Sequence, residues 1–560
     1  MNMVRLKNMQ YFLFVALAGL IMISCEKKSS SNVVDEEDGG VKLQFVVSSV
    51  EEFAVEEAKT ASVSRKASGV TTPQIESFEG FDAVAVSYDE DSDLKYEIAD
   101  KRAATFNAGN KYRVVLYEVS GTNETYVGQY VLTSGDNTST IPVNYNRTYK
   151  WYAISYNSSE VPAEVADPTS PSPTFNFANR DVLYASGQVT TSVLGNNPLG
   201  IKFRRLGSRI DVVFNAVGMS AWVLDQINVD LNVKQGVFNL KTGALVSSSN
   251  LTVNKANTDF TYVDASFQDI AAVSVYTVGN ESLGTFTPSL KKFRVVQHNS
   301  LTTSDSDAYI FGNGSSVIGS WNFSIGTPVK AKYYPFTINL VQAPITIGGV
   351  RFARGNIYDT DNASSQASPV RNAANMRRYK LRKQNANVNN YWIGANYHYT
   401  DYFRFGDSRA GSAPPLLGSF FNTAADGLDP CNFLYPYDTW KTPTRNELAV
   451  LSSASGKTFT SNYMEVPGTG PANSPYPSNN LRLEKKGIFE NLLASSPYIW
   501  NSGTHRYWST TNEGVWIIIG NIDWYYYAEM GSNSYNVPAA YGGLGQWAQH
   551  NHYPIRCVRK

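Results

Sequence analysis

Residues 440–448, Trp-Lys-Thr-Pro-Thr-Arg-Asn-Glu-Leu, carry the clearest local folding signal in this 560-residue chain. Thr444 and Glu447 have the spacing of a capping box, in which each side chain accepts a hydrogen bond from the backbone N–H of the other residue. The pattern predicts a short helix that starts at this box and buries Leu448 and Leu451 on one face.

This phrase lies in the last third of the chain, Tyr391–Lys560, where large aromatic residues are dense. A second short helix is predicted over residues 485–495, because its apolar residues fall on one helical face. Two aromatic strands are predicted around a turn at residues 520–523. The large rings are expected mainly in the core, at Trp508, Trp516 and Trp524. The last third is therefore expected to be an α+β domain.

The composition restricts the class of protein. A chain of 560 residues is too long for one core and predicts about three domains. Lys plus Arg equals Asp plus Glu at 48 each, which argues against a nucleic-acid-binding surface. Tyr, Thr, Val, Ser, Asn and Gly are plentiful, as is typical of β structure with long turns.

The chain before Ile345 reads as strands separated by turns. Lys111–Val119 and Tyr126–Leu132 predict a hairpin, and Ile227–Val233 alternates apolar and polar residues as a half-buried strand does. The boundary at Ala343-Pro344 leaves room for two successive β-sandwiches.

The amino terminus predicts export. Arg5 and Lys7 precede an apolar run, residues 11–23, that is short for a membrane span. Ser24-Cys25 then resembles a bacterial lipobox, although Met22 replaces the usual leucine. The resemblance implies a signal peptide over residues 1–24 and a lipid on Cys25; an ordinary signal peptide with a chance cysteine is the alternative.

The other two cysteines, Cys431 and Cys557, would lie in an oxidising compartment if the chain is exported. A disulfide between them is predicted and would stabilise the last domain by roughly 4–5 kcal/mol in the chain-entropy model. Two buried free thiols are the alternative.

Three stretches of the first 345 residues resemble the fimbrillins, the subunits of Bacteroidales type V fimbriae. They are the lipobox with the strand and basic residue that follow it, residues 111–117, and the phrase Gly-Ile-Lys-Phe-Arg-Arg-Leu-Gly-Ser-Arg-Ile at residues 200–210. The resemblance implies two transthyretin-like β-sandwiches in tandem. It also implies a precursor that is cut after a basic residue beyond the first strand, which leaves a groove for a donor strand from another subunit.

In this chain the removable strand would be residues 41–47, and its inward side chains would be Val41, Leu43, Phe45 and Val47. The cut would fall after Arg65, with Lys66 and Arg102 as rival sites. An exposed dibasic pair with no role in processing is the alternative.

The last domain resembles the Fibrobacter major paralogous domain, a C-type-lectin-like fold. The matching phrases are Arg354-Gly-Asn356, Asp429-Pro-Cys431, Trp440–Thr444 with Glu447, Tyr507–Thr510 and Arg556–Arg559. The carbohydrate-binding motifs of calcium-dependent lectins are missing, and only Trp500-Asn-Ser502 comes near one. The resemblance thus implies a fold without implying calcium.

Together these observations predict a mainly β chain with five segments. They are a signal peptide (1–24), a lipid tether with the removable strand and pro-segment (25–65), a first fimbrillin sandwich (66–198), a second (199–345) and a C-type-lectin-like domain (346–560).

No motif for catalysis or a cofactor stands out in the sequence. His550 and His552, with His505, have a spacing that a metal could use, but histidines without a carboxylate motif are more often structural, so no metal is predicted. An aromatic and amide-rich stretch near the end predicts an adaptable contact surface. The expected contact residues are Tyr526, Tyr535, Tyr541, Trp547 and His550.

The predicted function is that of a structural and adhesive fimbrial subunit, not an enzyme. Its expected partners are other fimbrillin subunits through donor-strand insertion, a surface glycan or protein, and the outer membrane through the precursor's lipid. Because no strand after the last domain could be donated, a position at the tip of the fimbria is expected. A surface glycan-binding lipoprotein that never polymerises is the alternative. An enzyme of the sulfatase-modifying or hydrolase kind is a third hypothesis.

Overall fold

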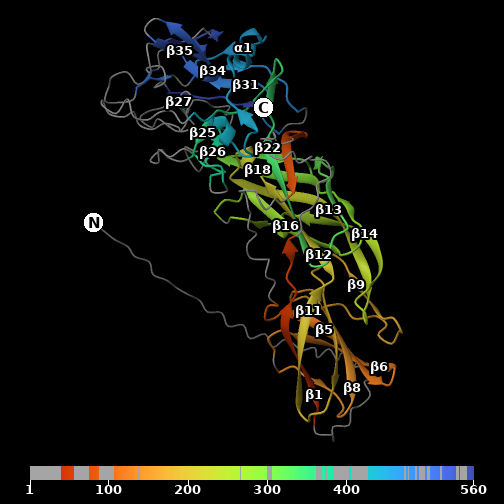
Figure 1. The fold of residues 1–560 in the computed structure, drawn as a ribbon. Coiled ribbons are helices and arrows are strands. Elements are labelled where there is room, and N and C mark those ends of the chain that lie inside the picture. Colours follow the sequence, from red (N-terminus) through yellow and green to blue (C-terminus); the bar gives the residue numbers. More distant parts are fainter. Residues whose placement is uncertain are drawn as a thin grey trace, which may run out of the picture.

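The computed structural model places three units one after another along an elongated molecule (Figure 1). It describes residues 40–55, 75–87, 106–136, 138–264, 266–298, 306–360, 369–372, 375–382, 403–404, 427–471, 475–476, 478–485, 488–490, 498–500, 505–517, 520–537, 541–542 and 552–560. The described part of the chain is mainly β, as predicted. No helix in this part is both long enough and apolar enough to cross a membrane.

The amino-terminal unit is a curled seven-stranded sheet with the order β6-β5-β8-β10-β11-β1-β7. Every strand contributes side chains to one buried cluster, so the two edges of the sheet must curve around a common core. The predicted hairpin is confirmed, with a turn through Gly121 at a φ of 61°. The strands are β1 (Lys42–Val50), β5 (Lys111–Ser120), β6 (Asn123–Thr133), β7 (Ile141–Pro142), β8 (Thr148–Ser155), β10 (Leu183–Thr190) and β11 (Asn196–Arg205).

The middle unit is a sandwich of two sheets around the largest apolar cluster. The predicted strand over residues 227–233 is confirmed inside β13, where alternate side chains enter the core. One sheet contains β2 (Ala54–Val55), β3 (Glu76–Ser77), β4 (Phe81–Ser87), β12 (Gly207–Asn215), β15 (Thr261–Tyr262), β16 (Ile270–Val278) and β22 (Lys332–Gln342). The other contains β9 (Thr174–Phe177), β13 (Val223–Asn239), β14 (Leu245–Ala256), β18 (Ser289–His298), β19 (Ser306–Phe311) and β20 (Gly319–Ser320), and β17 (Gly284–Phe286) pairs with β21 (Phe323–Gly326) beside them.

Sheet membership differs from the predicted boundaries of the first sandwich, residues 66–198. β4 pairs with β22, and β9 pairs with β13, so both strands belong to the middle unit. The physical reason is packing, since Phe81 and Ala83 of β4 are fully buried in the core of the middle unit.

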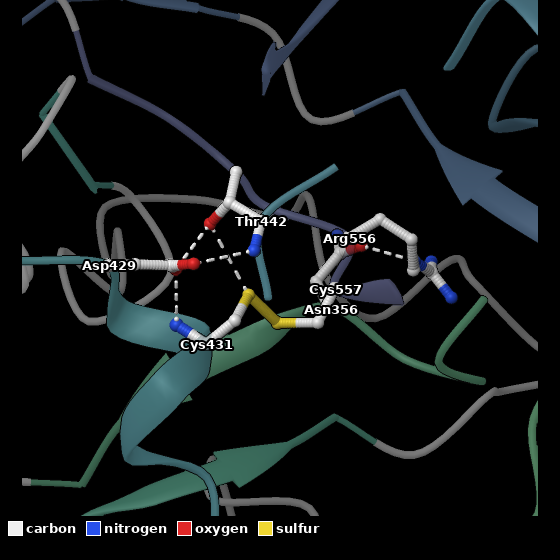
Figure 2. The surroundings of a disulfide bond; sticks show 6 residues. All are labelled: Asn356, Asp429, Cys431, Thr442, Arg556 and Cys557. Carbon is white, nitrogen blue, oxygen red and sulfur yellow. Dashed lines mark hydrogen bonds between the residues drawn. A yellow bond between two sulfur atoms is a disulfide. The ribbon is translucent and has the colours of Figure 1, made fainter. Parts of the chain in front are cut away.

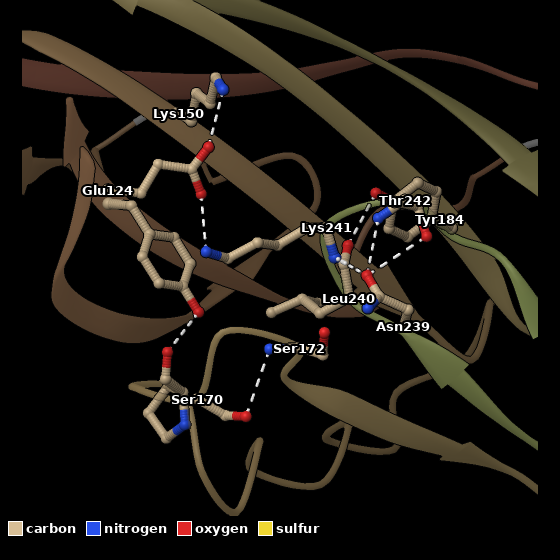
Figure 3. Close-up of polar contacts among 11 residues, drawn as sticks. Glu124, Lys150, Ser170, Ser172, Tyr184, Asn239, Leu240, Lys241 and Thr242 are labelled. Carbon is tan, nitrogen blue, oxygen red and sulfur yellow. Dashed lines mark hydrogen bonds and ion pairs between the residues drawn. The ribbon is translucent and has the colours of Figure 1, made fainter. Parts of the chain in front are cut away.

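The amino-terminal and middle units are joined by the polar contacts in Figure 3 and by a shared apolar cluster. Lys241, which follows β13, forms an ion pair of 2.8 Å with Glu124 of β6, and Lys150 of β8 binds the other carboxylate oxygen at 2.7 Å. The hydroxyl of Tyr184 donates to the carbonyl of Leu240 at 2.8 Å. Side chains of both units also share one buried cluster, so the two units form a continuous body.

The carboxy-terminal unit combines many short strands and one long hairpin with one α-helix and a 3-10 turn, Pro430–Phe433, among its described residues. The predicted helix is confirmed as α1 (Arg445–Ser453), with the Thr444 and Glu447 capping box in place and Leu448 and Leu451 buried. The strands of the unit are β23 (Ile345–Ile347), β24 (Val350–Phe352), β25 (Ile357–Asp359), β26 (Tyr379–Leu381), β27 (Phe403–Arg404), β28 (Trp440–Lys441), β29 (Thr458–Phe459), β30 (Tyr463–Val466), β31 (Leu481–Glu484), β32 (Ile488–Glu490), β33 (Tyr498–Trp500), β34 (His505–Ile517), β35 (Gly520–Met530), β36 (Tyr535–Asn536), β37 (Tyr541–Gly542), β38 (His552–Tyr553) and β39 (Val558–Arg559).

Two local predictions for this unit are wrong. Residues 488–490, expected in a second helix, form β32, because Ile488 pairs with Trp500 and Phe489 with Ile499. Residues 520–523, expected in a turn, belong to β35, and Gly520 pairs with Ile517 of β34.

Candidate functional site

The strand predicted to be removable is β1, and it is an inner part of the amino-terminal sheet. It runs parallel to β11 from Lys42 to Val50 and antiparallel to β7 at Lys42 and Leu43. Hydrogen bonds at its start tie it to the loops beside both neighbours, from Lys42 N to Gly195 O at 2.9 Å and from Val143 N to Val41 O at 3.0 Å. Removal of β1 would therefore leave backbone donors and acceptors without partners on β11 and β7.

The inward face of β1 fills the core of this unit. Val41, Leu43 and Phe45 are each at most 3% exposed, whereas Val46 on the other face is 41% exposed. Val47 is partly buried and packs against the same cluster. The Phe45 ring meets the Trp151 ring edge-on, with 5.6 Å between centroids. The predicted inward set thus lies together on one face and packs in the core of the unit.

Cys25, Arg65 and Lys66 lie outside the described residues, as does Arg102. The predicted lipid and processing sites therefore remain predictions from the sequence. Residues 56–74, which include Arg65 and Lys66, follow β2 in the chain.

The predicted disulfide between Cys431 and Cys557 is present (Figure 2). Asp429 supports the Cys431 side of the bond, since its carboxylate accepts hydrogen bonds from Cys431 N at 2.9 Å and from the Thr442 hydroxyl at 2.7 Å. Burial raises the pKa of the Asp429 carboxyl, and its hydrogen bonds oppose that rise. The disulfide and this carboxylate therefore form part of the framework of the unit.

Arg556 organises the other side of the disulfide. Its buried guanidinium donates to Asn356 Oδ1 at 2.8 Å, to the Arg354 carbonyl at 2.6 Å and to the Arg482 carbonyl at 2.6 Å. It also forms an ion pair of 3.3 Å with Glu484. These contacts join three separate stretches of the unit, at residues 354–356, 482–484 and 556, so the matching phrases that contain Arg354, Asn356 and Arg556 have a structural role.

The carboxy-terminal unit is docked on the middle unit through buried charges. Arg559 of β39 forms an ion pair of 2.7 Å with Asp82 of β4 and donates to the Gln342 carbonyl at 2.8 Å. Arg377 forms a 2.7 Å ion pair with Asp269, which is fully buried. The sequence predicted neither ion pair, because the partners lie far apart in the chain. Arg559 and Asp82 are 477 residues apart, and Arg377 and Asp269 are 108 residues apart.

Aromatic residues complete this interface. Tyr476 of the carboxy-terminal unit enters the core of the middle unit, where its ring lies 4.9 Å from that of Tyr309 and 5.9 Å from that of Phe311. The Arg354 guanidinium carbon lies 4.0 Å from the Tyr476 ring centroid on the side of its own unit. Ring packing therefore holds the two units together in addition to the ion pairs.

Two of the predicted contact residues do not form a surface. Tyr526 is 5% exposed and lies beneath Arg445, whose guanidinium carbon is 4.3 Å from its ring centroid. Tyr535 is 6% exposed, and its hydroxyl donates to the Leu448 carbonyl at 3.2 Å. Their prediction as ligand contacts is wrong, because both rings pack within the unit.

The other three predicted contacts are not tested. The backbone of Tyr541 lies in β37, which pairs with β35, while Trp547 and His550 fall outside the described residues. Among the residues that are described, no group of three His, Cys, Asp or Glu could hold a metal ion. His505 is 4% exposed, and burial together with the charge of Lys485 lowers its pKa to about 4.

Comparisons with known proteins find similarity in structure only. No family model and no curated protein matches the chain. A candidate cell adhesion protein of Bacteroides fragilis is similar at 11% identity and a TM-score of 0.28, over 53% of this chain and 92% of the other. A fimbrial assembly protein of Parabacteroides distasonis is similar at 10% identity and a TM-score of 0.22, over 46% and 89%.

The fimbrial anchor protein Mfa2 of Porphyromonas gingivalis is similar at 11% identity and a TM-score of 0.22, over 50% of this chain and 99% of the other. Identities and TM-scores this low do not transfer a function to the chain.

Proposed function

We propose that the chain is a structural and adhesive subunit of a Bacteroidales type V fimbria. In this proposal the chain is exported as an outer-membrane lipoprotein and loses β1 when it is cut after Arg65. It then accepts a donor strand from another subunit at the fimbria on the cell surface. The carboxy-terminal unit is presented as a lectin-like adhesin domain toward a surface glycan or protein. No catalytic activity is part of this role.

The observation that carries the proposal is the position of β1. The strand lies between β11 and β7, its inward side chains pack in the apolar core of the unit, and the residues that follow it include the basic pair Arg65-Lys66. A strand held by backbone hydrogen bonds and by alternate apolar side chains can be replaced by another strand with the same pattern. The fimbrillin-like phrases of the sequence support the same role.

We place the subunit at the distal tip because of β39. This strand pairs with β24 on one side and with β28 on the other, and its Arg559 is buried against Asp82. A strand paired on both sides within its own unit is not free for donation. The buried contacts between the carboxy-terminal and middle units also suit a domain that is held away from the shaft.

The test is mass spectrometry of the amino terminus of the surface form, with gold labelling of the carboxy-terminal unit on intact fimbriae. The proposal expects an amino terminus at Lys66, its loss in an Arg65→Ala/Lys66→Ala variant, and label at filament ends. The matched control, Arg102→Ala, should be processed normally. Label along the whole shaft would refute the tip position.

A second candidate is a glycan-binding surface lipoprotein that does not polymerise. It is favoured by the full pairing of β1 within its own chain, since this unit needs no partner to complete its sheet. A surface form that keeps lipidated Cys25 and β1 would support this candidate over the first.

A further inference from the structure

The residues directly after β1 cross from the amino-terminal unit to the middle unit. Glu51 N donates to the Phe203 carbonyl of β11 at 2.9 Å, and three residues later Ala54 N donates to the Ala331 carbonyl beside β22 at 2.9 Å. Ala54 and Val55 then form β2, which pairs in parallel with β22. The segment 42–55 is therefore one extended strap attached to both units.

Arg205 lies under the middle of this strap, at the end of β11. Its side chain is fully buried, and Nε and Nη2 donate to the Asp181 carboxylate at 3.0 and 3.2 Å. Nη1 is buried and has no hydrogen-bond partner among the described residues. Burying a cation whose hydrogen bonds are incomplete costs free energy. The stability of the buried Arg205 guanidinium therefore depends on the groups that pack against its face.

The strap contacts Arg205 in two ways. The carboxylate of Glu51 accepts a hydrogen bond of 2.9 Å from Arg205 N. The ring of Phe53 covers the guanidinium, whose carbon lies 4.0 Å from the ring centroid, and the same ring approaches Tyr276 of β16 at 6.4 Å. A carboxylate hydrogen bond to a backbone N–H and a ring over a guanidinium are both specific contacts.

The spacing of the two residues follows from the extended backbone. Side chains two positions apart lie on the same face of an extended segment, so Glu51 and Phe53 can reach the same buried residue together. Glu52 lies between them; Glu51 and Glu52 are both exposed, and Phe53 is half-buried. The core beneath β1 requires only alternate apolar side chains, a pattern that many strands share, whereas the Arg205 contacts require a carboxylate followed by a ring.

We propose that the junction around Arg205 is a recognition site that selects the replacing strand. The inference rests on the proposed strand replacement and specifies the residue pattern that the donor segment must have. The partner is a second subunit whose donor segment carries alternate apolar residues, then an acidic residue and an aromatic residue at the positions of Glu51 and Phe53. The donor must also be long enough to pair with β22 of the middle unit.

The test uses the full chain with a site-specific protease sequence inserted between Arg65 and Lys66. After the cut, a fluorescent peptide of residues 41–55 is added in excess, and the rate at which it replaces the chain's own segment is followed by anisotropy. The same measurement is made on full chains with Glu51→Gln, Phe53→Ala and the matched control Glu52→Gln. Circular dichroism before the cut checks that each variant is folded.

Glu51→Gln is expected to release its segment about fivefold faster, because a charge-assisted hydrogen bond is lost at a partly exposed site. Phe53→Ala is expected to release its segment about tenfold faster, through loss of the cation–π contact and of buried ring area. Glu52→Gln should release its segment at the wild-type rate. A competing peptide that ends at Val50 should bind at least tenfold more weakly than the longer peptide, since it lacks both contacts.

The outcomes separate the two ideas. Equal release rates for Glu51→Gln, Phe53→Ala and Glu52→Gln, with normal exchange, would overturn recognition at Arg205 and leave strand replacement standing. A segment that never exchanges in any chain would overturn strand replacement and the recognition site with it.

Discussion

The buried pair between Arg559 and Asp82 gives a quantitative test of how the carboxy-terminal unit is held. The Arg559 side chain is fully buried and that of Asp82 is 3% exposed, with 2.7 Å between their charged atoms. Burial lowers the pKa of Arg559 to about 10, and the charge of Asp82 opposes that change. The Asp82 carboxylate thus offsets the free-energy cost of burying the Arg559 charge at the interface.

The substitution Asp82→Asn keeps the size of the side chain and removes its charge. Because Arg559 would remain buried against Gln342 O and the Trp440 ring, the interface should lose about 3–5 kcal/mol of stability, as when one partner of a buried ion pair is removed. The double substitution Asp82→Leu/Arg559→Met removes both charges and should restore the interface to within about 1–2 kcal/mol of the original.

Native-state hydrogen exchange is the suitable assay, since a chain of several units need not unfold in one step. The informative amides are those of Ala353 and Lys560, which bond to Cys557 O and Thr439 O around β39. The control is Glu160→Gln, which removes an exposed partner of Arg180 and should cost below about 1 kcal/mol. Unchanged protection in Asp82→Asn, or a double variant no better than the single one, would refute the reasoning.

Three further predictions address other parts of the molecule. Phe45→Ala should destabilise the amino-terminal unit by about 3–5 kcal/mol because it leaves a cavity in place of a buried ring, whereas Val46→Ala on the exposed face should change the stability little. Hydrogen exchange of the β11 amides measures both effects, and equal effects would contradict the assignment of the two faces. His505 should contribute a loss of stability of about 3 kcal/mol as the pH drops from about 6.5 to about 4, because the unfolded chain protonates this histidine in that window and the folded chain does not. A His505→Gln variant should lack this component in acid titrations followed by urea unfolding, and a pH profile equal to that of the wild type would count against it. Cys431→Ser/Cys557→Ser should lower the stability of the carboxy-terminal unit by about 3–5 kcal/mol in calorimetry, and an unchanged unfolding transition would contradict a stabilising role for the disulfide.

Local and compositional signals in the sequence predicted several features correctly. The capping box of α1 could be read directly, because Thr444 and Glu447 act on each other within one helical turn. The disulfide followed from the two cysteines that remain when the first is assigned to a lipid. The alternation in β1 also predicted which of its side chains enter the core.

Features that depend on distant partners could not be predicted in the same way. The sequence of β4 is that of a strand but does not say which sheet it joins, and its partner β22 lies about 250 residues away. A short apolar run such as Ile488-Phe489 is compatible with a helix or a strand. It forms a strand because its backbone pairs with Trp500 and Ile499.

The contact surface was mispredicted for a related reason. Aromatic residues beside amides are typical of binding loops, but the same residues also build small β cores. Tyr526 and Tyr535 are buried because Arg445 covers one ring and the Leu448 carbonyl satisfies the hydroxyl of the other. Glu51 and Phe53 were overlooked because they follow the strand and their target, Arg205, lies far along the chain.

The parallel pairing of β1 with β11 has a mechanical consequence. Both strands follow the length of the molecule (Figure 1), so a pull along that length loads their shared ladder from Lys42 to Val50 in shear. Bonds loaded in shear must break together, whereas bonds at a peeling edge break one at a time. The ladder between β11 and the strand beside it is therefore oriented to resist a pulling force along the molecule, whichever chain supplies that strand.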